Sequence, residues 1–199
     1  MHLGWLAGRY PGRIGWLLSP SGWRRPHRWM PYALDNGAFP AWVNGTPWDD
    51  DGFCEMLELA AKHHAPRWVL VPDVVADREG TLTLWNQWRS ALHDYGWPLA
   101  FAVQDGMTQS DVPDDADVIF IGGTTAWKWQ TMWQWCANNP RVHVGRVNSY
   151  GRLWDCHEAG AESCDGTGWF RGDQLQLAGL EKYLAESLNG GRAQARLIA

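Results

Sequence analysis

Eight short runs of apolar residues are spaced along the chain, and most of them are continuous rather than alternating. Continuous apolar runs of this length are typical of parallel strands that are covered on both faces. The predicted strands span residues 2–7, 14–19, 32–35, 68–72, 99–104, 118–121, 142–147 and 161–165. Eight is the number of strands in a (β/α)8 barrel.

Helical patterns separate the later strands. The first predicted helix begins at Asp49 and stops before Pro66. The other four span residues 81–95, 127–137, 150–159 and 174–188. The first strands leave no room for crossover helices, and about 200 residues is the lower end for a (β/α)8 barrel. We therefore predict an α/β fold, a compact, trimmed (β/α)8 TIM-like barrel, with an open doubly wound sheet as the alternative.

The length of 199 residues predicts a single domain over residues 1–199. Within it we distinguish a basic segment at 1–34 and a closing helix and tail at 174–199. The four cysteines are scattered without the spacing of a zinc site, so we predict no metal, no cofactor and a reducing compartment. No export signal or membrane span is evident, which predicts a cytoplasmic protein with no membrane partner.

The charge is distributed unevenly. The first 34 residues hold five arginines and no acid, namely Arg9, Arg13, Arg24, Arg25 and Arg28. The whole chain has 17 basic and 22 acidic residues. Residues 35–199 therefore hold 12 basic and all 22 acidic residues, a charge of −10. Tryptophans interleave with these arginines, a mixture that can stack bases and contact phosphates. The segment predicts a local contact with a polyanion; the alternative is a chance group of solvated arginines.

Polar and glycine residues follow the predicted strands at the point where each strand ends. They are Asp35, Asp73, Gln104, Gly122, Gly123, Arg146, Asn148, Ser149 and Asp165. In a parallel barrel these ends share one mouth, so we expect the residues to surround one pocket. Each also has a plainer interpretation: a turn at Asp165, an Asx-turn at Asp35, a helix cap at Asp73, an ion pair at Arg146. His143, inside a strand, is interpreted as a core residue.

Four short motifs in this order resemble the tRNA-guanine transglycosylase (queuine tRNA-ribosyltransferase) family. Asp35-Asn36-Gly37-Ala38-Phe39 is similar to its Asp-Ser-Gly-Gly-Phe motif, and Val103-Gln104-Asp105-Gly106 to its Gln-Gly-Gly segment. Gly122-Gly123 resembles its Gly-Gly-Leu segment, and Cys164-Asp165 lies where the family carries its nucleophilic aspartate. The resemblance covers residues 32–168.

The chain departs from this family in two respects. It lacks the three cysteines and histidine of the family's zinc site near the C-terminus, and it is shorter than the members that act on tRNA. It is more similar to the short phage and bacterial relatives that insert 7-deazaguanines into DNA, which would place a phage-encoded protein in the host cytoplasm. The resemblance thus implies DNA, rather than tRNA, as the macromolecular substrate.

The resemblance implies a base exchange that replaces guanine with a 7-deazaguanine such as preQ0. Asp165 would form a covalent sugar ester, and Asp35 would act as the acid and base. Asp73 would accept hydrogen bonds from the base, while Gln104 and the glycine pair Gly122-Gly123 would contact its O6 side.

Groups around the mouth are expected to hold the flipped nucleotide. Arg146, Asn148 and Ser149 would contact its phosphate, and Phe39, with other aromatics, would stack on the base.

Two other functions remain open from the sequence. The first is a DNA glycosylase or nucleoside hydrolase, in which water resolves the intermediate. The second is a protein that binds a modified base or nucleotide without catalysis. A homodimer or an accessory protein that supplies DNA-binding surface is a further expectation.

Overall fold

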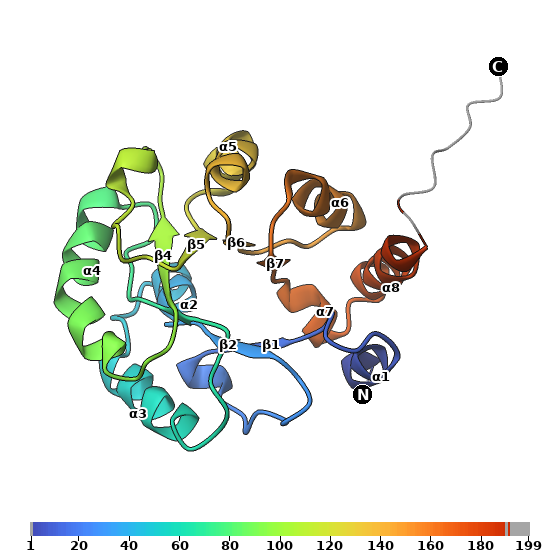
Figure 1. Cartoon of the computed structure of the whole chain (residues 1–199), viewed down its shortest axis with the longest axis horizontal. Helices are drawn as coiled ribbons and strands as arrows, with labels where there is room; N and C mark the ends of the chain where they lie inside the picture. Colours follow the sequence, from blue (N-terminus) through green and yellow to red (C-terminus); the bar gives the residue numbers. More distant parts are fainter. Residues whose placement is uncertain (1, 190, 192–199) are drawn as a thin grey trace.

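The computed structural model describes residues 2–189 and 191 of the chain. Seven parallel strands form one sheet, in which each strand pairs with the next one along the chain. The strands are β1 (Trp16–Leu18), β2 (Tyr32–Leu34), β3 (Val69–Leu70), β4 (Leu99–Val103), β5 (Val118–Ile121), β6 (Val142–Val144) and β7 (Ser163–Cys164). The sheet curls into an incomplete barrel, since no pairing joins β7 to β1 among the described residues (Figure 1).

The strand predicted at 2–7 is wrong, because residues His2–Arg9 form the helix α1. Leu6, Ala7 and Tyr10 are all buried, and Leu6 and Tyr10 lie one helical turn apart on the side that meets the core. The apolar run was therefore one face of a helix rather than a covered strand. With seven strands, the fold is an α/β half-barrel related to the (β/α)8 plan.

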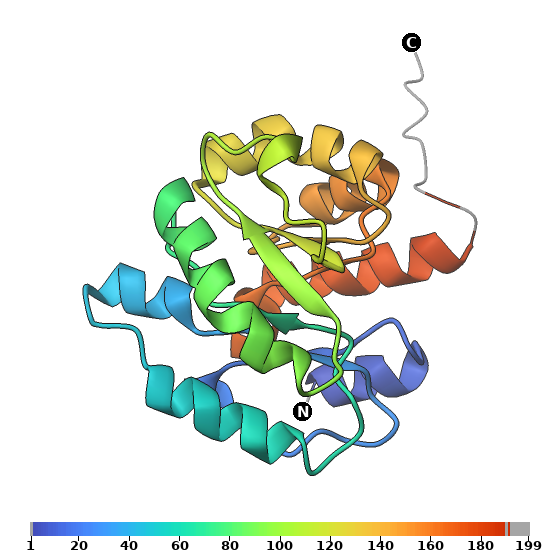
Figure 2. The same cartoon turned by 60° about the vertical axis from the view of Figure 1, so that its left-hand side comes forward.

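Helices cover the outer side of the sheet, where Figure 2 shows α3 and α4. The bounds are α2 (Ala38–Asn44), α3 (Asp50–Ala60), α4 (Arg78–His93), α5 (Thr125–Asn138), α6 (Tyr150–Ala159), α7 (Thr167–Arg171) and α8 (Gln174–Leu188), with 3-10 turns at Pro20–Gly22 and Gln109–Asp111. All five predicted helices are confirmed, and those predicted at 150–159 and 174–188 match to the residue. Residues 190 and 192–199 of the predicted tail lie outside the described residues.

Side chains at helix starts explain several of these boundaries. Asp49 accepts a hydrogen bond from the backbone N–H of Gly52 at 2.9 Å, which starts α3. Asp77 does the same for α4 through Gly80 at 3.1 Å. None of the helices among the described residues has the length and apolar character needed to cross a membrane.

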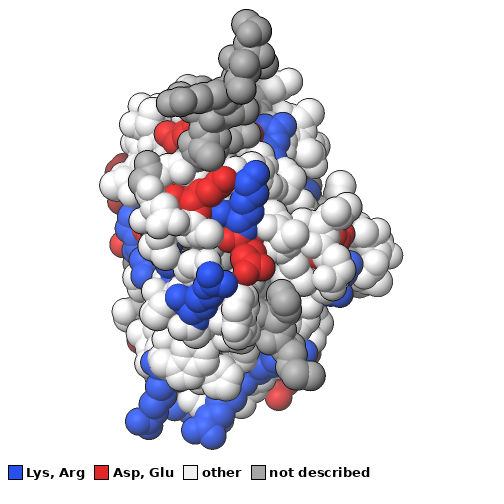
Figure 3. Space-filling view, turned by 90° about the vertical axis from the view of Figure 1, so that its right-hand side faces the viewer, with Lys and Arg blue, Asp and Glu red and all other residues white. Residues whose placement is uncertain are grey.

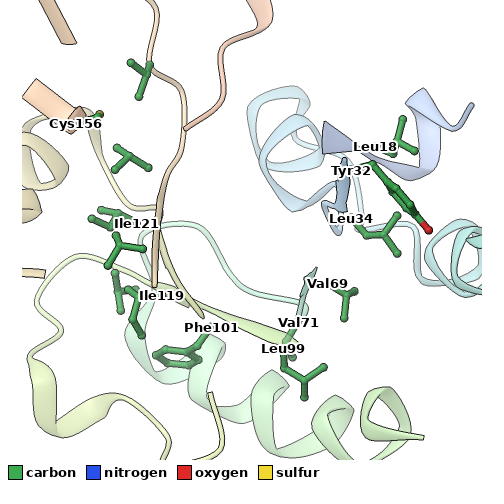
Figure 4. Packing of buried hydrophobic residues seen from close by; sticks show 14 of the residues in the cluster. Leu18, Tyr32, Leu34, Val69, Val71, Leu99, Phe101, Ile119, Ile121 and Cys156 are labelled. Carbon is green, nitrogen blue, oxygen red and sulfur yellow. The ribbon is translucent and has the colours of Figure 1, made fainter. Parts of the chain in front are cut away.

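Both faces of the sheet are buried, which explains why the strands are continuous apolar runs. Along β4, Leu99, Phe101 and Val103 join the large cluster between sheet and helices (Figure 4). The intervening Ala100 and Ala102 belong to a second, smaller cluster. Since alternate side chains point to opposite faces, this second cluster fills the inside of the curl.

An ionic contact closes the amino-terminal end of the curl. Glu162 accepts hydrogen bonds from Arg67 at 2.8 Å and from Arg141 at 2.7 Å. The two guanidinium groups lower the pKa of Glu162 to about 2. The contact ties together the segments that lead into β3, β6 and β7, so the opposite, carboxyl end of the sheet is the end left for a functional site.

Candidate functional site

The predicted site residues lie where the strands end at the carboxyl edge of the sheet. Asp35 follows β2, Gln104 follows β4, and Asp165 follows β7 directly, while Asp73 and Arg146 come two or three residues after their strands. Because all strands are parallel, these residues meet at one edge. Hydrogen bonds connect Gln104 to Asp73 and the Arg146 N–H to Asp165. Asp35 makes its own hydrogen bond to the Gly37 N–H.

Asp73 is held between two buried amides. Its Oδ1 accepts a hydrogen bond from Asn36 Nδ2 at 2.7 Å, and its Oδ2 accepts one from Gln104 Nε2 at 2.6 Å. The Asn36 amide also donates to the carbonyl of Val71 at 3.0 Å. Asn36 and Gln104 are each 1% exposed, so this cradle is part of the buried structure. Both oxygens of Asp73 therefore face fixed N–H donors.

Burial nonetheless makes the ionised form of Asp73 costly. Desolvation raises its pKa to about 7, helped by the charge of Asp35, although the Asn36 hydrogen bond and Arg146 oppose the rise. Near neutral pH the group is thus poised between its neutral and charged forms. The helix-cap interpretation of Asp73 does not describe its contacts, since Asp77 starts α4.

Gln104 organises the backbone of two neighbouring loops. Its Oε1 accepts hydrogen bonds from the N–H groups of Ala76 and Gly123, both at 2.9 Å. Ala76 has a positive φ of 59°, which an alanine rarely adopts, so the amide contact holds a strained backbone. The Gly123 N–H, predicted to read the base, donates to Gln104 in this structure.

Asp35 makes the predicted Asx-turn and faces the other carboxylates as well. Its Oδ1 accepts a hydrogen bond from the Gly37 N–H at 2.7 Å. Burial, together with the negative charge of Asp165, raises the pKa of Asp35 to about 6, although the Gly37 hydrogen bond and His143 oppose the rise. A carboxyl group with a pKa in this range can both give and take a proton near neutral pH.

Asp165 is held by a different set of donors. The backbone N–H of Arg146 lies 3.2 Å from its Oδ1 and 3.1 Å from its Oδ2. The Nε2 of His143 lies 3.2 Å from Oδ2, and the Nδ1 of His143 lies 2.8 Å from the Ser163 hydroxyl. The hydroxyl can donate to Nδ1, which lets the neutral ring donate from Nε2 to the carboxylate. These contacts hold the carboxylate in place, and the Asp165 side chain is still 18% exposed.

Arg146 lies at the same end of the sheet as the carboxylates and is half-buried. It has a positive φ of 58°, and its guanidinium donates to the carbonyl of Gly123 and lies 4.3 Å from the ring centre of Phe39. Burial lowers its pKa, while the charges of Asp165, Asp105 and Asp73 oppose that shift. Among the described residues it forms no ion pair with a carboxylate, so the predicted ion pair is absent there.

Other predicted residues lie at the periphery of this edge. Gly122 is buried beside Gln104, and a side chain there would meet the amide at 2.9 Å. Asn148 is exposed, and the Ser149 hydroxyl accepts the Arg152 N–H at 3.3 Å as the cap of α6. The structure therefore gives Ser149 a local structural contact.

Two buried polar residues near the carboxylates, Asn36 and His143, were not predicted as site residues. Asn36 lies beside Asp35 in a quoted motif, and His143 and Ser163 pair across β6 and β7. Lys128 is 1% exposed and donates to the carbonyl of Gly145 under the β6 end. Burial lowers its pKa to about 8. A polar residue at an inward position of an apolar strand was the signal that could have identified His143.

We expect His143 to position the carboxylate of Asp165. His143→Phe keeps an aromatic ring between Phe120 and Trp68, whose ring centres both lie 4.9 Å away, but removes both hydrogen bonds. Any reaction that begins with attack by Asp165 should slow by about 10–100-fold in kcat, with KM changed little.

The control for this variant is His143→Gln, which can still place an amide N–H toward Asp165. It should recover part of kcat, whereas a merely structural role would leave both variants equally impaired. Steady-state kinetics of the two proteins, with circular dichroism for folding, decides between these outcomes.

No family model matches the chain, and no curated protein matches it with significance. Among the described residues, no group of three or more His, Cys, Asp or Glu side chains is arranged to hold a metal ion. The carboxylates at this edge are therefore the feature of the molecule that points to a function.

Proposed function

We propose that the protein is a base-exchange transglycosylase that replaces guanine in DNA with a 7-deazaguanine of the preQ0 type. The observation that carries this proposal is the contrast between two carboxyl groups at one edge. Asp165 lies within hydrogen-bond distance of the His143 ring and of the Arg146 N–H and keeps part of its side chain exposed, while burial raises the pKa of Asp35 to about 6. Two carboxyl groups whose surroundings differ in this way suit the roles of a nucleophile and of an acid/base.

The first half of the reaction would form a covalent intermediate. A carboxylate oxygen of Asp165 attacks C1′ of the target nucleotide while the bond from C1′ to guanine breaks. Asp35 gives its proton to the departing guanine. The products of this half are free guanine, an aspartyl ester of the sugar and an ionised Asp35.

The second half would reverse these roles with a different base. Asp35 takes a proton from the incoming 7-deazaguanine, whose nitrogen attacks C1′ and displaces Asp165. Two displacements at the same carbon retain its configuration. Both carboxyl groups return to their starting forms, so the exchange needs no cofactor.

The cradle around Asp73 supports recognition of a guanine-like base. Such a base presents N–H donors on its Watson–Crick edge, and a carboxylate can accept from them. Because Asp73 already accepts from Asn36 and Gln104, the base would use the remaining lone pairs of its oxygens. The Phe39 ring under Arg146 offers a surface against which a flipped base can stack.

The choice of DNA comes from the resemblance to the short 7-deazaguanine transglycosylases and from the missing zinc site. The corresponding experiment incubates the protein with guanine-containing DNA, with and without preQ0, and analyses both partners by denaturing mass spectrometry. We expect a protein–DNA adduct and 7-deazaguanine in the digested DNA. Release of guanine without incorporation would instead indicate a glycosylase, and replacing DNA with tRNA tests the other substrate.

A further inference from the structure

The basic segment of the chain lines a hollow away from the carboxylate edge. A hollow of about 490 Å³ lies between the segment that precedes β2 and the segment that follows α3. Its lining consists of Arg25, Pro26, Arg28, Lys62, His63 and His64. Its volume is in the ~300–1,000 Å³ range of ligand sites, and no acidic residue is among its lining.

The cations of this hollow are not neutralised by their neighbours. Within residues 2–189 and 191, Arg25, Arg28 and Lys62 form no ion pair with a carboxylate. By contrast, Arg9 pairs with Glu181 at 3.4 Å and Arg13 donates to Ser187 at 3.1 Å. Of the basic segment 1–34, the loop that carries Arg24, Arg25 and Arg28 is therefore the part in which we expect the predicted contact with a polyanion.

This loop runs from the carboxyl ends of the strands to their amino ends. Residues 19–31 leave the carboxyl end of β1 and return to the amino end of β2, so they run along the full height of the strands. At the carboxyl side, the guanidinium of Arg24 lies 5.1 Å from the ring centre of Phe170 in α7, which begins two residues after Asp165. The cations of this loop thus extend from α7 to the hollow.

Aromatic rings accompany the cations. Trp29 is 59% exposed and stacks on His27, with ring centres 5.5 Å apart, and Trp23 stacks on His63 at 6.3 Å. An exposed indole beside unpaired arginines is the combination that binds single-stranded nucleic acid, through base stacking and phosphate contacts. On the side that carries α1 and α8, by contrast, basic residues (blue) and acidic residues (red) lie next to one another (Figure 3).

We infer that the loop 19–31 and the hollow bind the phosphate backbone of the DNA strand that carries the target base. Arg25, Arg28 and Lys62 contact phosphates in the hollow, and Trp29 stacks on a neighbouring base. The strand reaches the carboxylates over the open edge of the sheet between β7 and β1. This inference extends the proposed function to its DNA partner, so the test measures binding separately from exchange.

The test is fluorescence anisotropy of a labelled guanine-containing DNA strand, over a series of salt concentrations and without 7-deazaguanine. The double variant Arg25→Gln/Arg28→Gln should raise Kd about tenfold or more. It should also reduce the slope of log Kd against log salt by about 1.4, because each phosphate contact on a single strand contributes about 0.7. Trp29→Ala should raise Kd and leave the slope unchanged.

The matched control is Arg89→Gln/Lys182→Gln, which changes the net charge equally on α4 and α8. Equal effects of the two double variants would overturn the inference, as would displacement of the strand by inorganic phosphate at constant ionic strength, which would indicate a site for a free anion. A binding defect without any exchange activity in the wild type would retain the DNA contact at the loop and reject the transglycosylase. If the wild type is active in exchange and the double variant binds DNA normally, the transglycosylase is retained and the proposed DNA contact at the loop is rejected.

Discussion

Under the proposed mechanism, replacing Asp165 with asparagine should abolish incorporation of a 7-deazaguanine into DNA, with a loss on the order of 10³-fold or more. The asparagine can keep the hydrogen bond from the Arg146 N–H through its Oδ1, so the local backbone should be preserved. What the variant lacks is the carboxylate oxygen that we propose as the nucleophile in forming the sugar ester. The covalent protein–DNA adduct should disappear together with the activity, which mass spectrometry of the intact protein measures.

Asp114→Asn is the matched control, because it makes the same chemical change at an exposed carboxylate away from the site. It should form the adduct at the wild-type rate. DNA affinity should be unchanged in the Asp165 variant, since the proposed phosphate contacts lie elsewhere. Full exchange activity in Asp165→Asn would remove the nucleophile from the mechanism, whereas retained affinity for a free base in a wild type without turnover would point to a binding protein.

The apolar runs predicted most of the sheet because a buried parallel strand has no polar face. The strand at 118–121 matches β5 to the residue. The same argument was wrong for residues 2–7, where an apolar run is equally compatible with a short helix against the core. The short helices α2 and α7 were missed because five to seven residues hold too little periodicity to recognise.

The location of the site was easier to predict than its internal contacts. Polar residues at the ends of parallel strands must share one edge, so the sequence sufficed to gather Asp35, Asp73 and Asp165 there. The hydrogen bonds that other residues make to these carboxylates depend on register and side-chain direction. His143 reaches Asp165 because it lies opposite Ser163 in the pairing of β6 and β7, a register that no single segment encodes.

Replacing Asp35 with asparagine will separate activity from stability. Exchange should fall about 10²–10⁴-fold, because the variant cannot protonate the departing guanine or deprotonate the incoming base. Folding should become more favourable near neutral pH, because a half-buried, desolvated charge is removed while the Gly37 N–H keeps an oxygen acceptor. The gain in the free energy of unfolding should be on the order of 1–3 kcal/mol, since a pKa difference of one unit corresponds to about 1.4 kcal/mol.

The pH dependence of this gain follows from the direction of the shift. Burial raises the pKa of Asp35 from 3.8 to about 6, so between these values the folded protein binds more protons than the unfolded chain. The wild type therefore loses stability as the pH rises from about 4 to about 6, and the variant lacks that loss. Denaturant titrations should show equal stability below pH 4 and a constant advantage for the variant above pH 6.

A variant that is less stable than the wild type at every pH would show that Asp35 is held by contacts that its charge strengthens, contrary to its burial among other carboxylates. The kinetic counterpart is the rate of adduct formation. In the wild type this rate should fall as the pH rises through about 6, because Asp35 must carry a proton to release guanine. In the variant the remaining slow adduct formation should lose that dependence, which links the raised pKa of one buried carboxyl group to both the stability and the chemistry of the protein.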